Sequence, residues 1–236
     1  MKYSLIIPLW NEEKNISILV QAIIVEKLFE KGMGELMLIN NGSNDNSLKL
    51  INFYKKKFKW ITCIHLKKNL NYGGGIYEGI KKAKFNVVSF IPGDLQILPS
   101  EVSKIFNLFK IKYIKNTNAL VKGRRTIRLD SPQTQFISKA YTLITKIILG
   151  LSVDDINGLP KMFDKKLIKL FPKEIPNTFV FDALILYIAT KNKWEIIEFP
   201  VTFHARRNGL SSWSNKRLKI YLSTFIQIFL LRFKSD

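Results

Sequence analysis

Through the first 110 residues, short apolar runs alternate with longer segments whose apolar residues recur every three or four positions. The apolar runs are bounded by polar residues and lie at 4–9, 35–43, 60–66 and 86–94. Such runs are typical of strands buried on both faces of a sheet. The segments with helical spacing lie at 15–29, 48–54, 75–84 and 101–110, and Ser100 is placed to cap the last of them. This alternation predicts an α/β fold with a doubly wound, mostly parallel sheet flanked by helices.

The second half of the chain has a less regular pattern. It predicts a strand at 119–125, helices at 135–149 and 179–191, and a further strand at 194–204. Pro200 cannot donate a ladder hydrogen bond, so the last strand is expected at a sheet edge or at a bend. No Gly/Ser-rich or Pro-rich linker and no internal repeat interrupts the chain. We therefore expect one domain over residues 1–213, followed by a basic and apolar helical tail over 214–236.

Three polar segments follow predicted strands and mark a candidate ligand site: PLWNEE, NNGSND and PGDLQ. In open parallel sheets, ligands bind beyond the carboxyl ends of the strands. Asp94 and Gln96 lie two residues apart, so on an extended segment both side-chain oxygens can reach one hard cation such as Mg²⁺ or Mn²⁺. Asp at a strand end is also a common cap, so PGDLQ by itself equally fits a turn.

Glycines and arginines add two further candidate phosphate contacts. The segment NLNYGGGIYEGI places Glu78 where a dinucleotide-binding fingerprint requires its third glycine, which argues against a dinucleotide site. A glycine loop that opens a helix can still approach a phosphate. After the last strand, RRNGLSS (206–212) presents two arginines, whose guanidinium groups bind phosphate oxygens in pairs. A solvated basic loop is the alternative interpretation.

The charge balance adds an expectation about partners. The chain carries 38 Lys and Arg against 18 Asp and Glu, a net charge of +20. This potential attracts phosphate in a nucleotide, an anionic lipid or a nucleic acid, although a generally Lys-rich composition also accounts for it. No nucleic-acid recognition motif accompanies the charge, so no specific nucleic-acid partner is expected. The single cysteine, Cys63, excludes an internal disulfide and a cysteine-based zinc cluster.

The C-terminal tail suggests where the protein works. Its apolar stretch at 220–233 is too short to span a bilayer, and lysines and arginines flank it at 216, 217, 219, 232 and 234. Such a helix is typical of a segment that lies in a membrane interface over anionic headgroups. A helix packed against the domain or a second subunit is the alternative. Because the N-terminus turns polar too soon for a secretory signal, we expect a cytoplasmic protein, peripheral at the inner face of the cell membrane.

Taken in order, several segments resemble the successive motifs of family 2 glycosyltransferases, in particular the dolichyl-phosphate mannose synthase and polyprenyl-phosphate glycosyltransferase group. They are IIPLWNEEKNI, INNGSNDNS, NLNYGGGIYEGI, FIPGDLQILP, KGRRTIR, DDINGLPKMF and FPVTFHARRNGLSS. The resemblance covers residues 3 to about 213. It implies the Rossmann-like GT-A fold of nucleotide-diphospho-sugar transferases, a nucleotide-sugar donor, a divalent cation and inversion at the anomeric carbon.

The resemblance also implies roles for particular residues. The positions that match the nucleoside-binding segments or lie beside the base are Pro8, Trp10, Glu12, Ile39 and Asn41. The positions that match the metal and diphosphate site are Gly93, Asp94 and Gln96. The basic residues that such enzymes direct at a diphosphate or an acceptor phosphate match Arg125 and Arg206. Asp155 matches the family position of a general base for a hydroxyl acceptor.

The chain departs from the family pattern at three places. Amides, Asn40 and Asn41, replace both acids of the usual D-D-G-S segment, which changes the donor and acceptor pattern offered to a base. Pro92 replaces the first acid of D-A-D, so one carboxylate fewer is available and a weaker cation site is expected. Ser212 stands where a lysine is common in the late loop.

These observations predict a hexosyltransferase that uses a GDP- or UDP-sugar. A membrane polyprenyl phosphate is the leading hypothesis for the acceptor, because a phosphate is already an anion and needs no general base. Two alternatives stay open: transfer to a saccharide hydroxyl in polysaccharide synthesis at the cell envelope, and a non-catalytic nucleotide-sugar-binding domain with a degenerate metal site.

Overall fold

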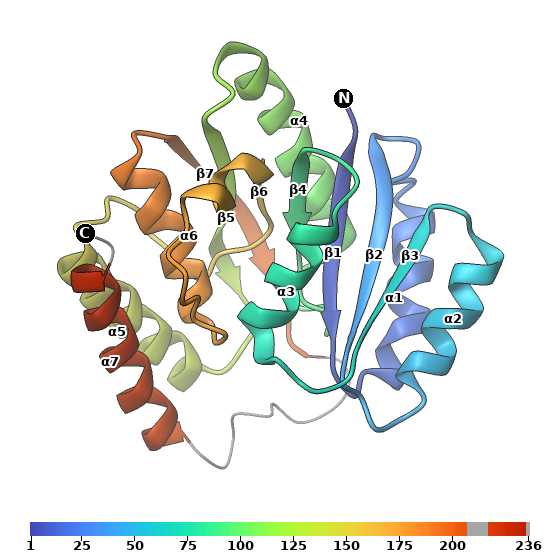
Figure 1. The fold of residues 1–236 in the computed structure, drawn as a ribbon, viewed down its shortest axis with the longest axis horizontal. Coiled ribbons are helices and arrows are strands. Elements are labelled where there is room, and N and C mark those ends of the chain that lie inside the picture. Colours follow the sequence, from blue (N-terminus) through green and yellow to red (C-terminus); the bar gives the residue numbers. More distant parts are fainter. Residues whose placement is uncertain (207–216, 235–236) are drawn as a thin grey trace.

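A mixed sheet forms the centre of the molecule (Figure 1). The computed structural model describes residues 1–206 and 217–234. Within them the strands are β1 (Tyr3–Leu9), β2 (Met33–Asn41), β3 (Ile61–Leu66), β4 (Val87–Phe90), β5 (Ala119–Arg128), β6 (Lys161–Asp164) and β7 (Glu195–Phe203). Their order across the sheet is β3-β2-β1-β4-β6-β5-β7. Only β6 runs antiparallel to its neighbours among these strands, so the predicted α/β fold with a mostly parallel sheet is confirmed.

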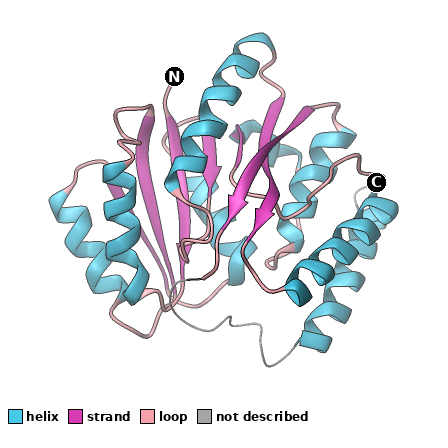
Figure 2. Ribbon diagram, turned by 180° about the vertical axis from the view of Figure 1, so that it is seen from behind, coloured by secondary structure: helices cyan, strands magenta, loops and turns pink. Residues whose placement is uncertain are grey.

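Helices cover both faces of the sheet (Figures 1 and 2). They are α1 (Glu13–Val25), α2 (Ser47–Lys57), α3 (Asn71–Lys82), α4 (Pro99–Lys115), α5 (Pro132–Leu149), α6 (Val180–Lys191) and α7 (Arg217–Lys234), with a 3₁₀ helix, η1, at Lys165–Leu170. In Figure 1, α3 and α6 lie in front of the strands and α4 lies behind them. A hydrogen bond of 2.9 Å from Ser103 Oγ to Glu26 Oε1 joins α4 to the end of α1 on that second face.

Burial explains why the apolar runs form strands and why one helix lacks a polar face. In β1, every residue except Pro8 is buried, because helices cover the sheet on both sides. Residues 180–189 of α6 are likewise all buried, so this helix is apolar around its whole circumference. Gly79 lets α3 approach the sheet, since a Cβ at this position would lie 2.5 Å from Ile6 Cγ2. The core therefore continues from the sheet into the α3–α6 layer.

Two local predictions are wrong. Leu98, not Ser100, is the N-cap of α4, because Pro99 occupies the first turn, where its fixed φ and missing N–H are tolerated. The helix predicted to reach residue 29 ends at Val25, and the chain then turns through Lys27, whose φ is +55°. The pattern also failed to indicate β6, a strand of four residues with only two apolar ones.

The predicted position of the last strand is confirmed. Strand β7 lies at the edge of the sheet and pairs only with β5 within the described residues. Pro200 lies opposite Arg124 in this ladder. An edge strand accepts a proline because the missing donor can face away from the sheet.

Helix α7, which forms most of the predicted tail, packs on the domain. Its Ile228 is fully buried, and Gln227 Oε1 accepts a hydrogen bond of 3.0 Å from Thr178 Oγ1, which precedes α6. The helix lies beside α5 in both views (Figures 1 and 2). The predicted boundary between residues 213 and 214 lies outside the described residues. Across the described part of the chain, no helix is both long enough and apolar enough to cross a membrane.

Candidate active site

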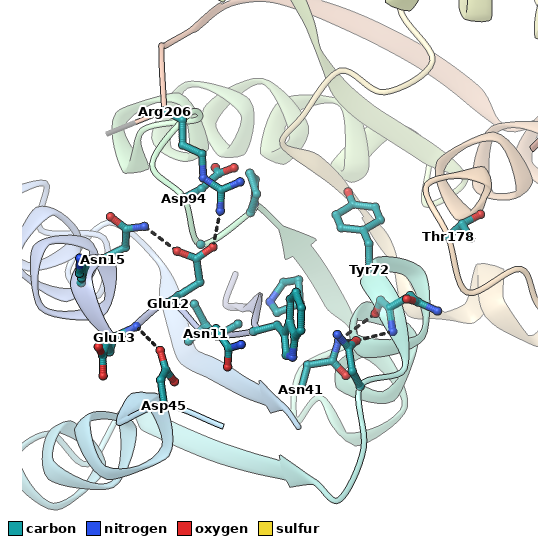
Figure 3. Close-up of a pocket in the computed structure, with 18 of the residues that line it drawn as sticks. Asn11, Glu12, Glu13, Asn15, Asn41, Asp45, Tyr72, Asp94, Thr178 and Arg206 are labelled. Atoms are coloured by element: carbon teal, nitrogen blue, oxygen red, sulfur yellow. Dashed lines mark hydrogen bonds and ion pairs between the residues drawn. The ribbon is translucent and has the colours of Figure 1, made fainter. Parts of the chain in front are cut away.

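The candidate site is a pocket of about 720 Å³ at the carboxyl ends of the parallel strands (Figure 3). Its walls come from the ends of β1, β2 and β4, the start of α3, and the segments that precede α6 and follow β7. Of the residues that the sequence predicts for the site, the pocket lining contains Pro8, Trp10, Glu12, Asn41, Gly93, Asp94 and Arg206. The lining does not contain Ile39, Gln96, Arg125 or Asp155. Strand ends far apart in sequence thus converge at the edge where ligands of parallel sheets bind.

The loops after β1 and β2 support each other at the rim of this pocket. Glu12 donates its backbone N–H to Ser47 Oγ at 2.9 Å, and Glu13 donates its own to Asp45 Oδ2 at 3.1 Å. Asp45 in turn accepts from the backbone N–H of Ser47 at 2.9 Å. The polar residues of WNEE and NNGSND thereby fix the two loops against each other, which leaves the Glu12 carboxylate facing the pocket.

Glu12, Asp94 and Arg206 form the charged centre of the pocket (Figure 3). Arg206 Nη2 donates to Glu12 Oε1 at 2.7 Å, and Asn15 Nδ2 donates to Oε2 at 2.5 Å. Burial raises the pKa of Glu12, and the negative charge of Asp94 raises it further, although the hydrogen bonds from Asn15 and Arg206 oppose this. Burial also raises the pKa of Asp94, while the Gln96 backbone N–H and the charge of Arg206 lower it. Arg206 therefore hydrogen-bonds to the Glu12 carboxylate and also acts through its charge on that of Asp94.

The backbone around Asp94 has an unusual conformation. Leu95 is buried and has φ +63°, in the left-handed region that branched apolar residues rarely adopt. Gly93 precedes Asp94 at a close approach to β1, since a Cβ there would lie 2.3 Å from Leu9 Cδ2. Strained backbone that the surroundings hold in place is concentrated at functional sites. Leu95 and Gly93 are thus the observable reasons why the turn presents Asp94 to the pocket.

Gln96 is tied to the end of β7. Its Nε2 donates to the carbonyl oxygen of His204 at 3.2 Å, and the backbone N–H of His204 donates back to the Gln96 carbonyl at 2.8 Å. These bonds connect the PGDLQ turn to the segment that carries Arg206. Asp94 and Arg206 are therefore positioned by one hydrogen-bonded unit, although Gln96 and His204 are 108 residues apart in the sequence.

The two asparagines at the end of β2 have different surroundings. Asn40 is fully buried, and its Nδ2 lies 2.7 Å from Nδ1 of His65 on β3. Asn41 lines the pocket, where its Nδ2 donates to the Asn71 carbonyl at 2.9 Å and its Oδ1 accepts from the Leu70 N–H at 2.9 Å. Both amides hold neighbouring strands or loops in place. Ile39 is a core residue with no exposed surface.

Arg125 and Asp155 form a buried ion pair away from the pocket lining. Arg125 donates through Nε to Asp155 Oδ2 at 2.8 Å and through Nη2 to Oδ1 at 2.7 Å, and its guanidinium also contacts Ser138 and the ring of Phe203. Although burial opposes ionisation, the hydrogen bonds and charge of Arg125 hold the pKa of Asp155 well below its usual range. A carboxylate held in this way is a weak base.

The sequence did not single out several residues of the pocket. Tyr72 and Thr178 line it. Asp182, which is close enough to influence Tyr72, forms a buried ion pair with Lys161, with Nζ and Oδ1 2.5 Å apart. Burial raises the pKa of Tyr72, and the charge of Asp182 raises it further. The glycines beside Tyr72 serve packing, because a Cβ at Gly73 would lie 2.6 Å from Phe181 Cβ. The NYGGG segment, which opens a predicted helix, was the signal available in the sequence, but its glycines suggested a phosphate loop and not a role for Tyr72.

The residues of the pocket fit a divalent cation that is held mainly by its ligand. The described residues contain no group of three or more His, Cys, Asp and Glu side chains arranged to hold a metal alone. Asp94 and Glu12 nevertheless place two carboxylates in one pocket with Arg206, and burial raises the pKa of each. This leaves negative charge for a cation to offset. Mg²⁺ and similar ions are often held by one or two carboxylates together with substrate phosphates.

Comparisons with known proteins agree with this arrangement. The sequence profile described as glycosyl transferase family 2 matches residues 4–171. The dolichyl-phosphate beta-glucosyltransferase ALG5D of Trichomonas vaginalis is 25% identical over 219 residues, which are 85% of this chain and 65% of the relative. The dodecaprenyl-phosphate galacturonate synthase of Rhizobium johnstonii is 23% identical, over 100% of this chain and 69% of the relative. The chain thus spans about two thirds of the length of these relatives.

The fold has counterparts among solved structures. The glucosyl-3-phosphoglycerate synthase of Mycobacterium tuberculosis superimposes with a TM-score of 0.69 at 16% identity, over 99% of this chain and 79% of that one. The same enzyme, in complex with Mn²⁺, UDP and glucosyl-3-phosphoglycerate, matches with a TM-score of 0.67. The expected GT-A fold is therefore confirmed. With the family profile matched over most of its length, the chain belongs to glycosyl transferase family 2.

Proposed function

We propose that this glycosyltransferase moves a sugar from a nucleoside diphosphate donor to a polyprenyl phosphate, with inversion at the anomeric carbon. The donor part of the proposal is supported by a pocket at the strand ends that combines two carboxylates with an arginine. A structural relative has been solved with Mn²⁺ and UDP-glucose. The acceptor part is supported by two relatives whose names include dolichyl phosphate and dodecaprenyl phosphate.

The hydrogen bonds and the lowered pKa of Asp155 are the observations on which we base the proposed acceptor. A sugar hydroxyl needs a general base to remove its proton, whereas a phosphate monoester already bears negative charge at neutral pH. Both oxygens of Asp155 accept hydrogen bonds from Arg125, and the pKa of this carboxyl is well below its usual range. We therefore assign Asp155 a positioning role, in which it orients Arg125. This assignment favours an acceptor that needs no base.

Arg206 is the residue that we assign to the leaving diphosphate. Its guanidinium contacts Glu12 at 2.7 Å, and a guanidinium binds phosphate oxygens in the same paired geometry as a carboxylate. A bound donor would compete with Glu12 for Arg206. The positive charge then stabilises the charge that develops on the diphosphate as the glycosidic bond breaks. Trp10, 40% exposed at the pocket wall, offers an apolar surface for the nucleoside.

Asp94, with Glu12 nearby, is the part of the pocket that would hold Mg²⁺ or Mn²⁺. When bound, such a cation supplies Lewis-acid stabilisation of the departing diphosphate. Asp94 also keeps the turn in shape, since its Oδ1 accepts the Gln96 N–H at 3.2 Å. Because Pro92 contributes no ligand, we expect cation binding to be weak until a nucleotide is present.

The test is a transfer assay with matched acceptors. Purified protein would be given UDP-glucose or GDP-mannose, Mn²⁺ and either a polyprenyl phosphate in detergent or a soluble disaccharide. We expect transfer to the lipid phosphate and none to the disaccharide. The Asp155→Asn variant should retain 10% or more of the wild-type transfer rate, and the Arg206→Gln variant should lose transfer. Transfer to the disaccharide that requires Asp155 would replace this acceptor assignment with a hydroxyl acceptor.

A further inference from the structure

Exposed apolar side chains gather on two adjacent helices, one of which, α7, contributes a residue to the pocket lining. On α5 they are Phe136, Leu143 and Ile147, and on α7 they are Ile226, Phe229, Leu230 and Phe233. Their exposed fractions run from 42% for Leu230 to 74% for Phe136 and Ile147. Single exposed apolar residues are common on proteins, but a contiguous group of them marks an interaction surface.

The spacing of these residues makes each group a continuous stripe. On α5, positions 136, 143 and 147 lie on one side of the helix, opposite the buried Tyr141, Thr145 and Leu149. On α7, positions 226, 229, 230 and 233 lie opposite the buried Thr224, Ile228 and Leu231. The two helices lie side by side and contact each other (Figures 1 and 2). Each helix thus presents one apolar stripe to its partner elements and a second one outward.

The charges on these helices identify the partner. Each helix has 18 residues, and neither contains an Asp or a Glu. Their charged residues are Lys139, Lys146, Arg217, Lys219, Arg232 and Lys234. Lys146 lies 3.8 Å from Asp154, but every charged residue of the two helices themselves is positive. Helices with an outward apolar stripe and only positive charges of their own suit the interface of an anionic bilayer. It suits a second copy of the same face poorly, because two such faces would repel each other.

The location of the helices connects this face to the pocket. Helix α5 begins four residues after β5 ends at Arg128, and Ser223 of α7 lines the pocket. All strands except β6 have their carboxyl ends at this same edge. A bilayer that contacts α7 and its neighbour α5 would therefore lie close to one wall of the pocket, where a lipid-linked phosphate can be presented.

We propose that α5 and α7 together form a docking face for an anionic membrane surface, through their exposed apolar residues. The sequence of the tail alone predicted membrane contact for the segment that forms α7. The contribution of α5 to the docking face is inferred from the structure. The docking face rests on the proposed function only for the identity of the acceptor, since binding to lipid can be measured without a donor or acceptor.

Vesicle co-sedimentation tests the proposal. The full chain would be mixed with vesicles of phosphatidylglycerol and phosphatidylcholine, or of phosphatidylcholine alone, in the absence of nucleotide. We expect binding to the anionic vesicles, and at least a tenfold weaker partition for Leu143→Ser/Ile147→Ser on α5 and for Phe229→Ser/Phe233→Ser on α7. The matched control is Ile111→Ser/Ile114→Ser on α4, whose side chains are 59% and 75% exposed, against 59% and 74% for Leu143 and Ile147.

The outcomes separate the docking face from the proposed function. Loss of vesicle binding in the α5 and α7 variants, with unchanged binding in the α4 control, supports the face whether or not transfer activity is found. Wild-type protein that ignores anionic vesicles, or an α4 control that loses binding equally, overturns it. A concentration-dependent dimer that the α5 or α7 changes abolish would assign the face to a second copy instead. Unchanged melting temperatures and nucleotide affinity would show that the variants are folded.

Discussion

Three charged residues determine how strongly the pocket can bind a diphosphate. Glu12 holds Arg206 at 2.7 Å, and Asp94 lies in the same cluster (Figure 3). The charge of Arg206 is therefore offset by protein carboxylates, with which a diphosphate would compete. Donor binding exchanges these partners, so the strength of the Glu12–Arg206 contact becomes part of the donor affinity. Two predictions at the scale of single residues follow from this arrangement.

Glu12→Gln should release Arg206 and strengthen the binding of a bare diphosphate. We expect a several-fold tighter dissociation constant for inorganic pyrophosphate in the absence of metal, measured by calorimetric titration, because a competing negative partner has been removed. Arg206→Gln should weaken the same binding. Glu13→Gln is the control, since it removes an equal charge from the neighbouring residue, whose Oε2 accepts from Asn46. Weaker pyrophosphate binding by Glu12→Gln would contradict the exchange.

Asp94→Asn should separate function from stability. Because burial raises the folded-state pKa of Asp94 above its unfolded value, the ionised carboxylate opposes folding, and this cost appears as the pH rises through that interval. We expect the variant to melt about 2–4 °C higher at neutral pH, for a gain of roughly 1 kcal/mol. It should also lose the Mn²⁺-dependent part of nucleotide binding. A lower melting temperature at neutral pH would show that Asp94 is structural.

At the scale of elements, the Arg125–Asp155 pair joins β5 to the loop before β6. Asp155 also accepts the Arg125 backbone N–H at 3.0 Å, and its own N–H donates to Glu198 on β7 at 3.2 Å. The pair therefore holds an irregular loop against the edge of the sheet. Its energetic role is structural, because removing one partner leaves a buried charge without compensation.

Asp155→Asn should destabilise the fold by about 3–5 kcal/mol near neutral pH. The folded-state pKa of Asp155 is lowered, so its stabilising contribution is fully present above the unfolded value of about 3.9 and is lost as the pH falls through the folded value. The difference in unfolding free energy between wild type and variant should accordingly shrink below about pH 4. Urea titrations at several pH values measure this. A difference that stays constant down to pH 2 would refute it.

At the scale of the whole molecule, the net charge of +20 acts together with the docking face. Exposed charges are screened over about 10 Å at 0.1 M salt, whereas apolar insertion does not depend on this screening. We expect vesicle binding to weaken more than tenfold between 0.05 and 0.5 M NaCl, and pyrophosphate binding in the partly buried pocket to weaken less. Vesicle sedimentation measures the first binding and calorimetry measures the second, on the same protein sample. Equal salt dependence would mean that charge alone governs both.

The sequence by itself determined the alternation of strands and helices and the convergence of the WNEE, NNGSND and PGDLQ segments. Apolar runs and helical spacing are local properties, and parallel strands necessarily bring their carboxyl ends to one edge. The same reasoning failed at β6, because its neighbours in the sheet, not its own composition, make it a strand. It failed at Ser100, because Pro99 took the first turn of α4.

Only the tertiary structure decided which side chains pair with one another. Arg206 and Glu12 are 194 residues apart, and Arg125 and Asp155 are 30 apart. No local pattern reveals that the first arginine faces the pocket while the second is buried against its own carboxylate. The apolar stripe that α5 exposes likewise depends on tertiary packing, because α7 and the domain cover other parts of this helix. Periodicity specifies which residues are apolar, but packing determines which of them remain exposed, because burial depends on contacts between elements distant in sequence.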